Sequence, residues 1–261
     1  MRRISPLVFV ERALLLILVS ALATVASAGG INDTGITSCY TDVTAGATGV
    51  ASDSGGYPRQ DCRYGRDAGQ TAGKLVKVGA GGKGFDFTRI DSGGNDLAAG
   101  VTTGWTCTRD NVTRLIWEVK TTTGLRSQSH TYKWYKSDTS SNGGDAGFAS
   151  TPADFNVACA TAGRCDTEKF RDDVNSQGLC GANNWRIPTR NELGSLLDYS
   201  RTSPPIDIEY FPNTPASVFW TDTPDSKYTG FAYQMDFSKG LTSSIDKGLA
   251  GAVRLVRSAT P

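Results

Sequence analysis

The clearest structural signal in this sequence is Trp185-Arg186-Ile187-Pro188-Thr189-Arg190-Asn191-Glu192-Leu193. The Thr189 hydroxyl can accept from the Glu192 N–H while the Glu192 carboxylate accepts from the Thr189 N–H, and this reciprocal capping box marks a helix start. The pattern predicts a helix from Arg190 to about Tyr199.

Apolar spacing around this helix predicts a buried core. Leu193, Leu196 and Leu197 share one helical face, and Trp185 and Ile187 point the incoming strand toward the same core. We therefore interpret a set of five residues as a fold motif and not as a ligand site: Trp185, Arg186, Pro188, Thr189 and Glu192.

The rest of the chain predicts one further long helix and several strands. Asp166 or Thr167 can cap a helix that carries Phe170 and Val174 on one face and stops at Gly178. A helical turn is expected after Pro152. Strands are expected over Arg114–Lys120, Val218–Trp220, Phe231–Phe237 and Ala252–Val256, and alternation over Gly84–Asp91 adds a candidate strand. Helices between an early strand and later strands indicate an α+β fold.

Several motifs together resemble the Lcl C-terminal domain family of bacterial secreted proteins. The motif above is preceded by Asp110-Asn111-Val112-Thr113-Arg114-Leu115-Ile116-Trp117-Glu118 and followed by Ile206-Asp207, Tyr210-Phe211-Pro212, Phe219-Trp220 and Val253-Arg254-Leu255-Val256-Arg257. The resemblance implies a C-type-lectin-like domain over 105–261, with two helices and a mostly antiparallel sheet. Two positions depart from the family pattern: Arg114 stands where glycine is usual, and Leu255 where cysteine is common.

The first residues resemble a secretion signal. Residues 1–28 combine Arg2 and Arg3 with an apolar run and the small residues Ala26-Ser27-Ala28, the pattern of a cleaved signal peptide. We expect a secreted protein at the cell surface, outside the cell or in the periplasm, with no membrane span after leader removal. Residues 29–104 read as a Gly/Ser/Thr-rich, loop-rich extension that a disulfide staples, with a flexible spacer as the alternative.

Charge argues against nucleic acid as a partner. Removal of the leader takes three of the 27 basic and one of the 26 acidic residues, so the remainder is nearly neutral. No basic run appears, and the electrostatic footprint of a nucleic-acid-binding domain is missing from the sequence.

Six cysteines behind a leader indicate disulfides. The sequence alone cannot choose among their pairings. The pairings that rank first are Cys39 with Cys62 in the N-terminal extension of residues 29–104, called the front segment, Cys159 with Cys165 in a short loop, and Cys107 with Cys180 closing the domain that the resemblance implies. Zinc spacings of the CxxC type are absent.

Catalytic patterns are weak in this sequence. His130 is the only histidine, and nothing near it resembles a nucleophile motif. The distantly similar formylglycine-generating enzymes share an Arg-Leu-Pro-Thr-x-x-Glu element, but their chemistry needs reactive thiols. In this sequence a disulfide partner can be proposed for each of the six cysteines, so no free thiol is expected. We therefore expect a protein that is not an enzyme, and keep the formylglycine type as an alternative.

The lectin-like resemblance implies a ligand site in the long loop and adjacent strand, roughly residues 200–233. The candidate ligand-binding residues are Asp207, Glu209, Asp222, Asp225 and Tyr228, and Asp222 with Asp225 could hold calcium, the one cofactor considered. Asp138, Asn142 and Asp145 of a Gly-rich loop form a weaker calcium candidate. Trp220 is interpreted as core.

These patterns predict a non-catalytic binding module for adhesion, with a glycan or a surface protein as partner. The alternative from another class is a structural subunit that self-assembles into a pilus or filament. The two differ in surface, because a glycan site needs convergent polar and aromatic groups whereas assembly needs a broad apolar face.

Overall fold

The computed structural model describes residues 30, 32–39, 59–153 and 157–259. Its helices in these ranges are α1 (Asp61–Tyr64), α2 (Arg66–Thr71), α3 (Thr167–Ser176) and α4 (Arg190–Gly194), with a 3-10 turn, η1, at Leu179–Gly181. None of these helices is long and apolar enough to cross a bilayer. The expected leader and most of the turn expected after Pro152 lie outside the described residues.

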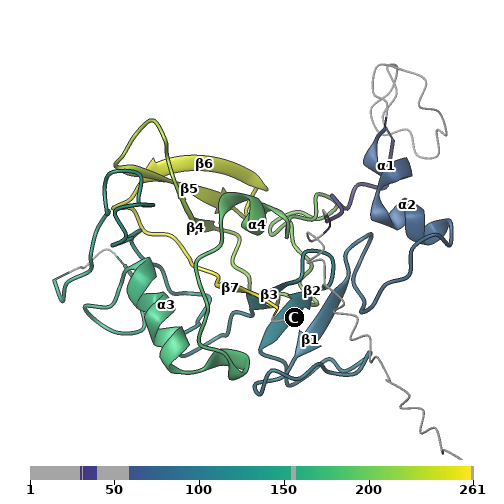
Figure 1. The fold of residues 1–261 in the computed structure, drawn as a ribbon, viewed down its shortest axis with the longest axis horizontal. Coiled ribbons are helices and arrows are strands. Elements are labelled where there is room, and N and C mark those ends of the chain that lie inside the picture. Colours follow the sequence, from purple (N-terminus) through teal and green to yellow (C-terminus); the bar gives the residue numbers. More distant parts are fainter. Residues whose placement is uncertain (1–29, 31, 40–58, 154–156, 260–261) are drawn as a thin grey trace, which may run out of the picture.

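Two antiparallel sheets form the body of the described structure (Figure 1). The four-stranded sheet has the order β1-β2-β3-β7, with strands at Phe87–Ile90, Cys107–Asp110, Leu115–Glu118 and Val256–Ser258. The three-stranded sheet has the order β4-β5-β6, with strands at Val218–Pro224, Phe231–Asp236 and Leu241–Asp246. The expected α+β class is confirmed, whereas the C-type-lectin-like arrangement stays a prediction.

The turn between β2 and β3 shows why one sequence motif folds as it does. The buried Asp110 carboxylate accepts from the Val112 N–H at 2.9 Å and from the Thr113 hydroxyl at 2.7 Å. Arg114 has φ 59°, a left-handed conformation that favours glycine. The Asn32 amide also donates to Asp110 at 2.6 Å, so the same carboxylate anchors the front segment.

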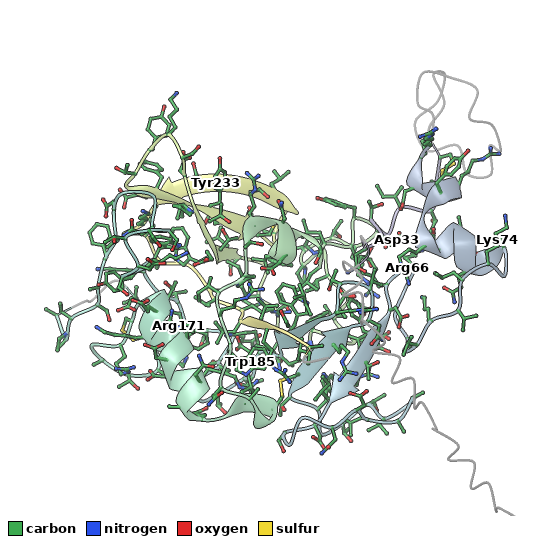
Figure 2. The ribbon with its side chains drawn as sticks, viewed as in Figure 1. Asp33, Arg66, Lys74, Arg171, Trp185 and Tyr233 are labelled. Carbon is green, nitrogen blue, oxygen red and sulfur yellow. A yellow bond between two sulfur atoms is a disulfide. The ribbon has the colours of Figure 1, made fainter. Side chains whose placement is uncertain are left out.

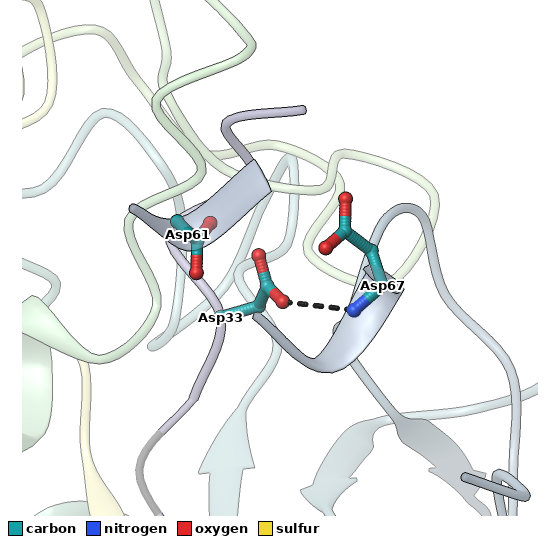
Figure 3. Close-up of side chains that lie close together, drawn as sticks. All are labelled: Asp33, Asp61 and Asp67. Carbon is teal, nitrogen blue, oxygen red and sulfur yellow. Dashed lines mark hydrogen bonds between the residues drawn. The ribbon is translucent and has the colours of Figure 1, made fainter. Parts of the chain in front are cut away.

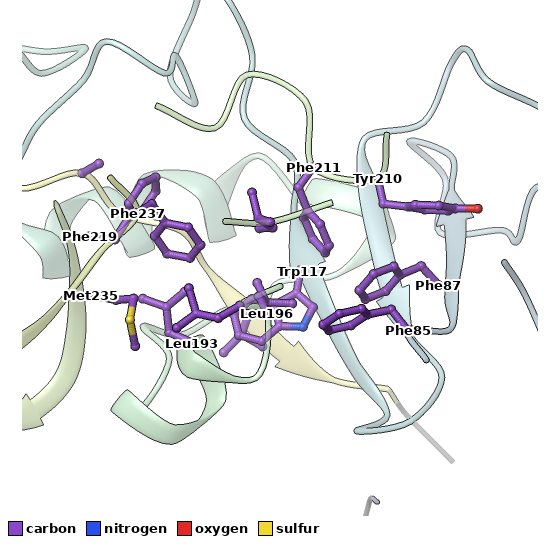
Figure 4. Close-up of a cluster of buried hydrophobic side chains, with 14 residues drawn as sticks. Phe85, Phe87, Trp117, Leu193, Leu196, Tyr210, Phe211, Phe219, Met235 and Phe237 are labelled. Carbon is purple, nitrogen blue, oxygen red and sulfur yellow. The ribbon is translucent and has the colours of Figure 1, made fainter. Parts of the chain in front are cut away.

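One apolar core lies between the two sheets (Figure 4). It packs Phe87 and Trp117 of the four-stranded sheet against Phe219 and Met235 of the three-stranded sheet. The predicted leucines of the capping-box helix complete it: Leu193, Leu196 and Leu197. Burial of each such side chain contributes about 1.5–3 kcal/mol to folding, so this core fixes how the sheets meet.

A second core lies under α3. It contains Trp134, Phe170, Trp185, Ile187 and Trp220, all of them buried. Trp220 is thus a core residue, as expected. The expectation that Trp185 and Ile187 join the core of Leu193 is wrong, because both side chains belong to this second cluster, and the residue between them forms only an isolated bridge, Arg186↔Val256.

The capping box is present at the start of α4. Thr189 Oγ1 accepts from the Glu192 N–H, and Glu192 Oε2 accepts from the Thr189 N–H at 2.8 Å. The helix ends at Gly194 and not near Tyr199, because the chain continues in tight turns from Leu193 to Leu196 and from Gly194 to Leu197. Leu196 and Leu197 are still buried, so the turns bury the same leucines that a longer helix would have buried.

Substitution Thr189→Ala is expected to lower the free energy of unfolding by about 0.5–2 kcal/mol, because the Glu192 N–H loses its side-chain acceptor. Thr189→Ser keeps the hydroxyl and should retain most of the stability. Urea denaturation of both variants measures the difference, and equal losses would show that the methyl group and not the cap matters.

Other elements follow the sequence less closely. Asp166 caps α3 by accepting from the Lys169 N–H at 2.8 Å, and β3 and β5 lie where strands are expected. The last strand is β7 rather than Ala252–Val256, and β2 and β6 were not expected. Part of the 29–104 segment completes the larger sheet, since β1 pairs with β2 from Phe87↔Asp110 to Ile90↔Cys107.

Three disulfides join the six cysteines as Cys39–Cys62, Cys107–Cys180 and Cys159–Cys165. These are the pairings that ranked first in the sequence. Disulfides form and persist in oxidising environments, so they indicate a compartment outside the reducing cytosol.

Candidate functional site

A polar groove of about 200 Å³ lies where four segments meet beside the Trp185–Leu193 motif. Residues 134–136 and 138 form one wall, called the 134–138 wall, and Thr167, Glu168 and Arg171 of α3 form another. The remaining lining residues are Arg186 and Ile187 from the motif and Asp222 from β4. We call this site the central groove. Arg171, labelled in Figure 2, belongs to its α3 wall.

Local hydrogen bonds hold the α3 wall against the 134–138 wall. The Thr167 hydroxyl donates to the Tyr135 carbonyl at 2.9 Å and accepts from the Tyr135 N–H at 3.1 Å. Glu168 accepts from the Ser137 N–H at 3.2 Å and from the Ser137 hydroxyl at 3.0 Å. The groove is thus a preformed feature whose two walls are bonded across the first turn of α3.

Ion pairs arrange the charges of the groove. Lys136 Nζ lies 2.8 Å from Asp222 Oδ2, and Arg171 contacts Glu168 at 3.3 Å. Arg186 donates to the capping carboxylate of Glu192 through both terminal nitrogens. Burial raises the pKa of the Asp222 carboxyl, and the bond and charge of Lys136 oppose that rise. The Lys136 ammonium therefore favours the ionised form of Asp222.

The charges that line the groove are balanced. Lys136, Arg171 and Arg186 are cationic, and Asp138, Glu168 and Asp222 are anionic. Such a surface offers paired donors and acceptors without a net field that would select a charged ligand. Charged groups make stronger hydrogen bonds than neutral groups do. A ligand hydroxyl can donate to the anionic side chains of the groove and accept from the cationic ones, so hydroxyl groups are suitable partners for this surface.

The predicted ligand residues do not converge on this groove, and Asp222 alone among the five lines it. Asp207 is buried: Oδ1 accepts from the Glu209 N–H at 3.1 Å, and Oδ2 accepts from the Gly82 N–H at 3.2 Å. The carbonyl of Glu209 accepts from Arg89 at 2.9 Å. These two residues hold the loop of residues 207–209 against Gly82 and against Arg89 of β1.

Asp225 and Tyr228 lie in the turn between β4 and β5. The buried Asp225 carboxylate accepts from the Lys227 N–H at 2.8 Å and the Tyr228 N–H at 3.2 Å. Its pKa is lowered, first by a bond from the Ser244 side chain and then by these backbone donors. Tyr228 is exposed and packs its ring 5.9 Å from Phe231. Asp225 thus shapes a turn while Asp222 faces the groove.

The Gly-rich loop uses its polar side chains for its own turns. Asp138 accepts from both Ser140 and Ser141, which lowers its pKa to about 2. Asn142 accepts from the Gly144 N–H at 2.9 Å, and Asp145 from the Gly147 N–H at 2.8 Å. Calcium at this loop, or at Asp222 with Asp225, stays a prediction.

Three carboxylates do gather in the front segment (Figure 3). One oxygen each of Asp33, Asp61 and Asp67 lie within 4.8 Å of one another, and within the described ranges no other group of three or more acidic, histidine or cysteine ligands is this close. Asp33 Oδ2 accepts from the Asp67 N–H at 3.1 Å, and Asp61 accepts from the Thr34 hydroxyl at 2.5 Å. These oxygens are of the hard type that calcium takes.

Burial is the first cause of a raised pKa at both Asp61 and Asp67, and the negative charge of Asp33 adds to each. A folded-state pKa above the unfolded value contributes stability that is present below about pH 4 and lost as pH rises through the folded pKa. Substitution Asp67→Asn is therefore expected to raise the free energy of unfolding at pH 7 by less than about 1 kcal/mol, since solvent screens the half-buried group.

Thermal unfolding between pH 3 and pH 7 measures this effect. The gain in Asp67→Asn should vanish toward pH 3, where the wild-type carboxyl is protonated. Asp91→Asn is the matched control: its pKa is lowered by hydrogen bonds from Asn95, so its neutralisation should give no gain at pH 7. A destabilised Asp67→Asn at pH 7 would contradict the assigned repulsion.

The lone histidine lies in a larger open depression of about 510 Å³ that also contains Asp173 and Ser176. Its Nδ1 lies 3.1 Å from the Leu125 carbonyl. The Ser176 hydroxyl donates to the Asp173 carbonyl at 2.8 Å, and the Asp173 carboxylate binds Arg164 at 2.6 Å. The His130 ring, the Asp173 carboxylate and the Ser176 hydroxyl therefore each bond to a group outside a catalytic triad. They do not form the chain of hydrogen bonds that activates a serine.

Comparison with known proteins identifies the domain. Residues 106–257, more than half of the chain, match the family described as Lcl C-terminal domain. No curated protein and no solved structure matches the chain. The matched range begins one residue before β2 and ends within β7, so it includes both walls of the central groove. The chain therefore belongs to the Lcl C-terminal domain family.

Proposed function

We propose that this protein is a secreted, non-catalytic adhesion module that binds a neutral glycan in the central groove. The balanced set of three cationic and three anionic side chains around one concave site carries this proposal. Sugar hydroxyls both donate and accept, so they match alternating charged groups that are already held in place. The half-buried Tyr135 adds an aromatic surface to the same wall.

Two observations support a role without catalysis. All six cysteines lie in disulfides, so the described chain offers no thiol for the chemistry of formylglycine-generating enzymes. The depression around His130 holds its serine and aspartate in other bonds. Three disulfides support a location at the cell surface or in the periplasm.

The test is a glycan array that includes neutral, anionic and cationic glycans, probed with the purified protein. We expect neutral glycans to give the signal. The double variant Lys136→Ala/Asp222→Ala removes one ion pair of the groove without changing net charge, and should weaken binding of the best array glycan by roughly tenfold or more, the equivalent of one charged hydrogen bond.

The matched control is Arg109→Ala/Asp96→Ala, which removes an exposed pair of 2.6 Å that does not line the groove. Its glycan binding should equal that of the wild type. Equal binding by both double variants would place the site elsewhere. A signal from charged glycans alone would contradict the argument from charge balance.

Self-assembly into a filament is a second candidate, favoured by strand β6. Within the described chain, β6 pairs with β5 on one side and forms no ladder on the other, and Leu241 is exposed at its start. Open edge strands can pair with another chain. Light scattering distinguishes the candidates: a monomer that binds glycan supports the adhesion module, and a polymer that binds none supports assembly.

A further inference from the structure

Lys247 carries an ammonium group that the fold has enclosed. The residue is fully buried, and its Nζ donates to the carbonyls of Asn142 at 3.0 Å, Asp145 at 2.6 Å and Thr229 at 2.6 Å. The same Nζ lies 4.3 Å from the centre of the Trp134 ring. An ammonium has three donors, and all three are used here. The ring face adds a favourable cation–π contact.

The three carbonyls come from two separate loops. Asn142 and Asp145 belong to the Gly-rich loop, which continues the 134–138 wall of the central groove, and Thr229 belongs to the β4–β5 turn. The Gly-rich loop folds back on that wall, since the Lys136 N–H donates to Ala146 and the Phe148 N–H donates to Trp134. Lys247 thus joins the groove wall to the three-stranded sheet.

A ring of inward carbonyl oxygens is also how loops hold metal ions. Here the chain supplies its own cation at that position. We propose that Lys247 is the internal cation that positions residues 134–148, which comprise the 134–138 wall and the Gly-rich loop after it. The order of this segment then does not depend on a bound metal ion. The proposal concerns the wall itself, and its link to ligand binding rests on the proposed function.

Hydrogen exchange measured by mass spectrometry tests the proposal without any glycan. In Lys247→Met, amides of residues 136–148 and 225–231 should exchange roughly ten- to a hundredfold faster, as expected for the loss of one or more charged hydrogen bonds. Amides of β2 and β3 should keep wild-type protection. Lys239→Met is the matched control, because Lys239 is exposed, and it should change none of these segments. Wild-type protection of 136–148 in Lys247→Met would overturn the proposal.

Chemical rescue separates the role of the cation from mere packing. Lys247→Ala removes three methylenes and the ammonium, which together equal n-propylammonium. Added n-propylammonium chloride should restore protection of 136–148 in Lys247→Ala, whereas tetramethylammonium, which has no N–H donors, should not. Equal effects of the two salts would overturn the assignment. If Lys247→Ala does not fold, the same comparison is made on its refolding yield, with the same two outcomes.

The wild-type protein tests metal independence. Millimolar EDTA or calcium chloride should leave exchange of residues 136–148 unchanged. Faster exchange in EDTA would overturn the proposal. No glycan enters these measurements. If hydrogen exchange confirms the role of Lys247 but no glycan on the array gives a signal, the proposed function alone is refuted.

Discussion

Substitution Glu118→Leu is expected to lower the free energy of unfolding by about 3–5 kcal/mol, the usual result of removing one partner from a buried ion pair. Glu118 and Lys120 are essentially inaccessible to solvent, and Lys120 Nζ lies 3.0 Å from Glu118 Oε1. The other carboxylate oxygen accepts from the Leu255 N–H at 2.9 Å. Loss of the carboxylate removes the counter-ion of the Lys120 ammonium, which keeps a bond to the Val253 carbonyl at 3.0 Å, and leaves the Leu255 amide without its side-chain acceptor.

A second buried cation increases this dependence on Glu118. Arg254 is 1 % exposed, and burial lowers its pKa to about 10, which the charge of Glu118 opposes. Burial also lowers the pKa of Lys120, and there too the Glu118 charge is the chief opposing influence. One carboxylate thus supports two cations in the core.

Urea denaturation of single and double variants tests the assignment. Glu118→Leu/Lys120→Met removes both charges and should recover much of the stability that Glu118→Leu loses, because apolar replacement of a whole buried pair is often neutral. The exposed pair Arg109–Asp96 serves as control, since its removal should cost less than about 1 kcal/mol. A double variant no more stable than Glu118→Leu would show that the loss does not arise from the unpaired Lys120, and would assign it to packing, to Arg254 or to the Leu255 amide.

Local signals in the sequence predicted local structure well. The capping box of Thr189 and Glu192 and the N-cap of Asp166 are set by residues three apart, and both were found as expected. The end of α4 was not predicted, because tight turns after Gly194 bury the same leucines that a longer helix would. Apolar spacing alone cannot tell these two solutions apart.

Strands β2 and β6 escaped prediction for a different reason. The first, with the sequence Cys-Thr-Arg-Asp, is ordered by its pairing with β1 and β3. The second carries Thr242, Ser243 and Ser244 on a sheet edge and shows little apolar alternation. Their neighbours in space, and not their own residues, make them strands.

The central groove could be predicted only in part. Asp222 was named as a ligand residue and Arg186 only as a fold residue, while Lys136, Glu168 and Arg171 had no distinguishing pattern. They meet because α3 docks its first turn on Tyr135 and Ser137. Lys247 was missed for the same reason: its three acceptors are backbone carbonyls, which leave no mark in a sequence.

Replacement of the Cys107–Cys180 disulfide by Cys107→Ala/Cys180→Ala is expected to lower the free energy of unfolding by about 4 kcal/mol. The bond connects β2 to the η1 turn across 73 residues, and both cysteines are buried in the second core. A cross-link restricts the unfolded chain more when the loop that it closes is longer. This disulfide should therefore be the largest single covalent contribution to the stability of the domain.

The Cys159–Cys165 disulfide is the internal control for this argument. It closes a loop of only 6 residues in sequence, so Cys159→Ala/Cys165→Ala should lose about 2 kcal/mol on the same entropy relation. Urea denaturation of the two double variants compares the losses directly. If the short-loop variant lost as much stability as the long-loop variant, chain entropy would not explain the stabilisation. The native-state contacts of the bonds, such as the Thr106 hydroxyl 3.0 Å from Cys180 Sγ, would then have to account for it.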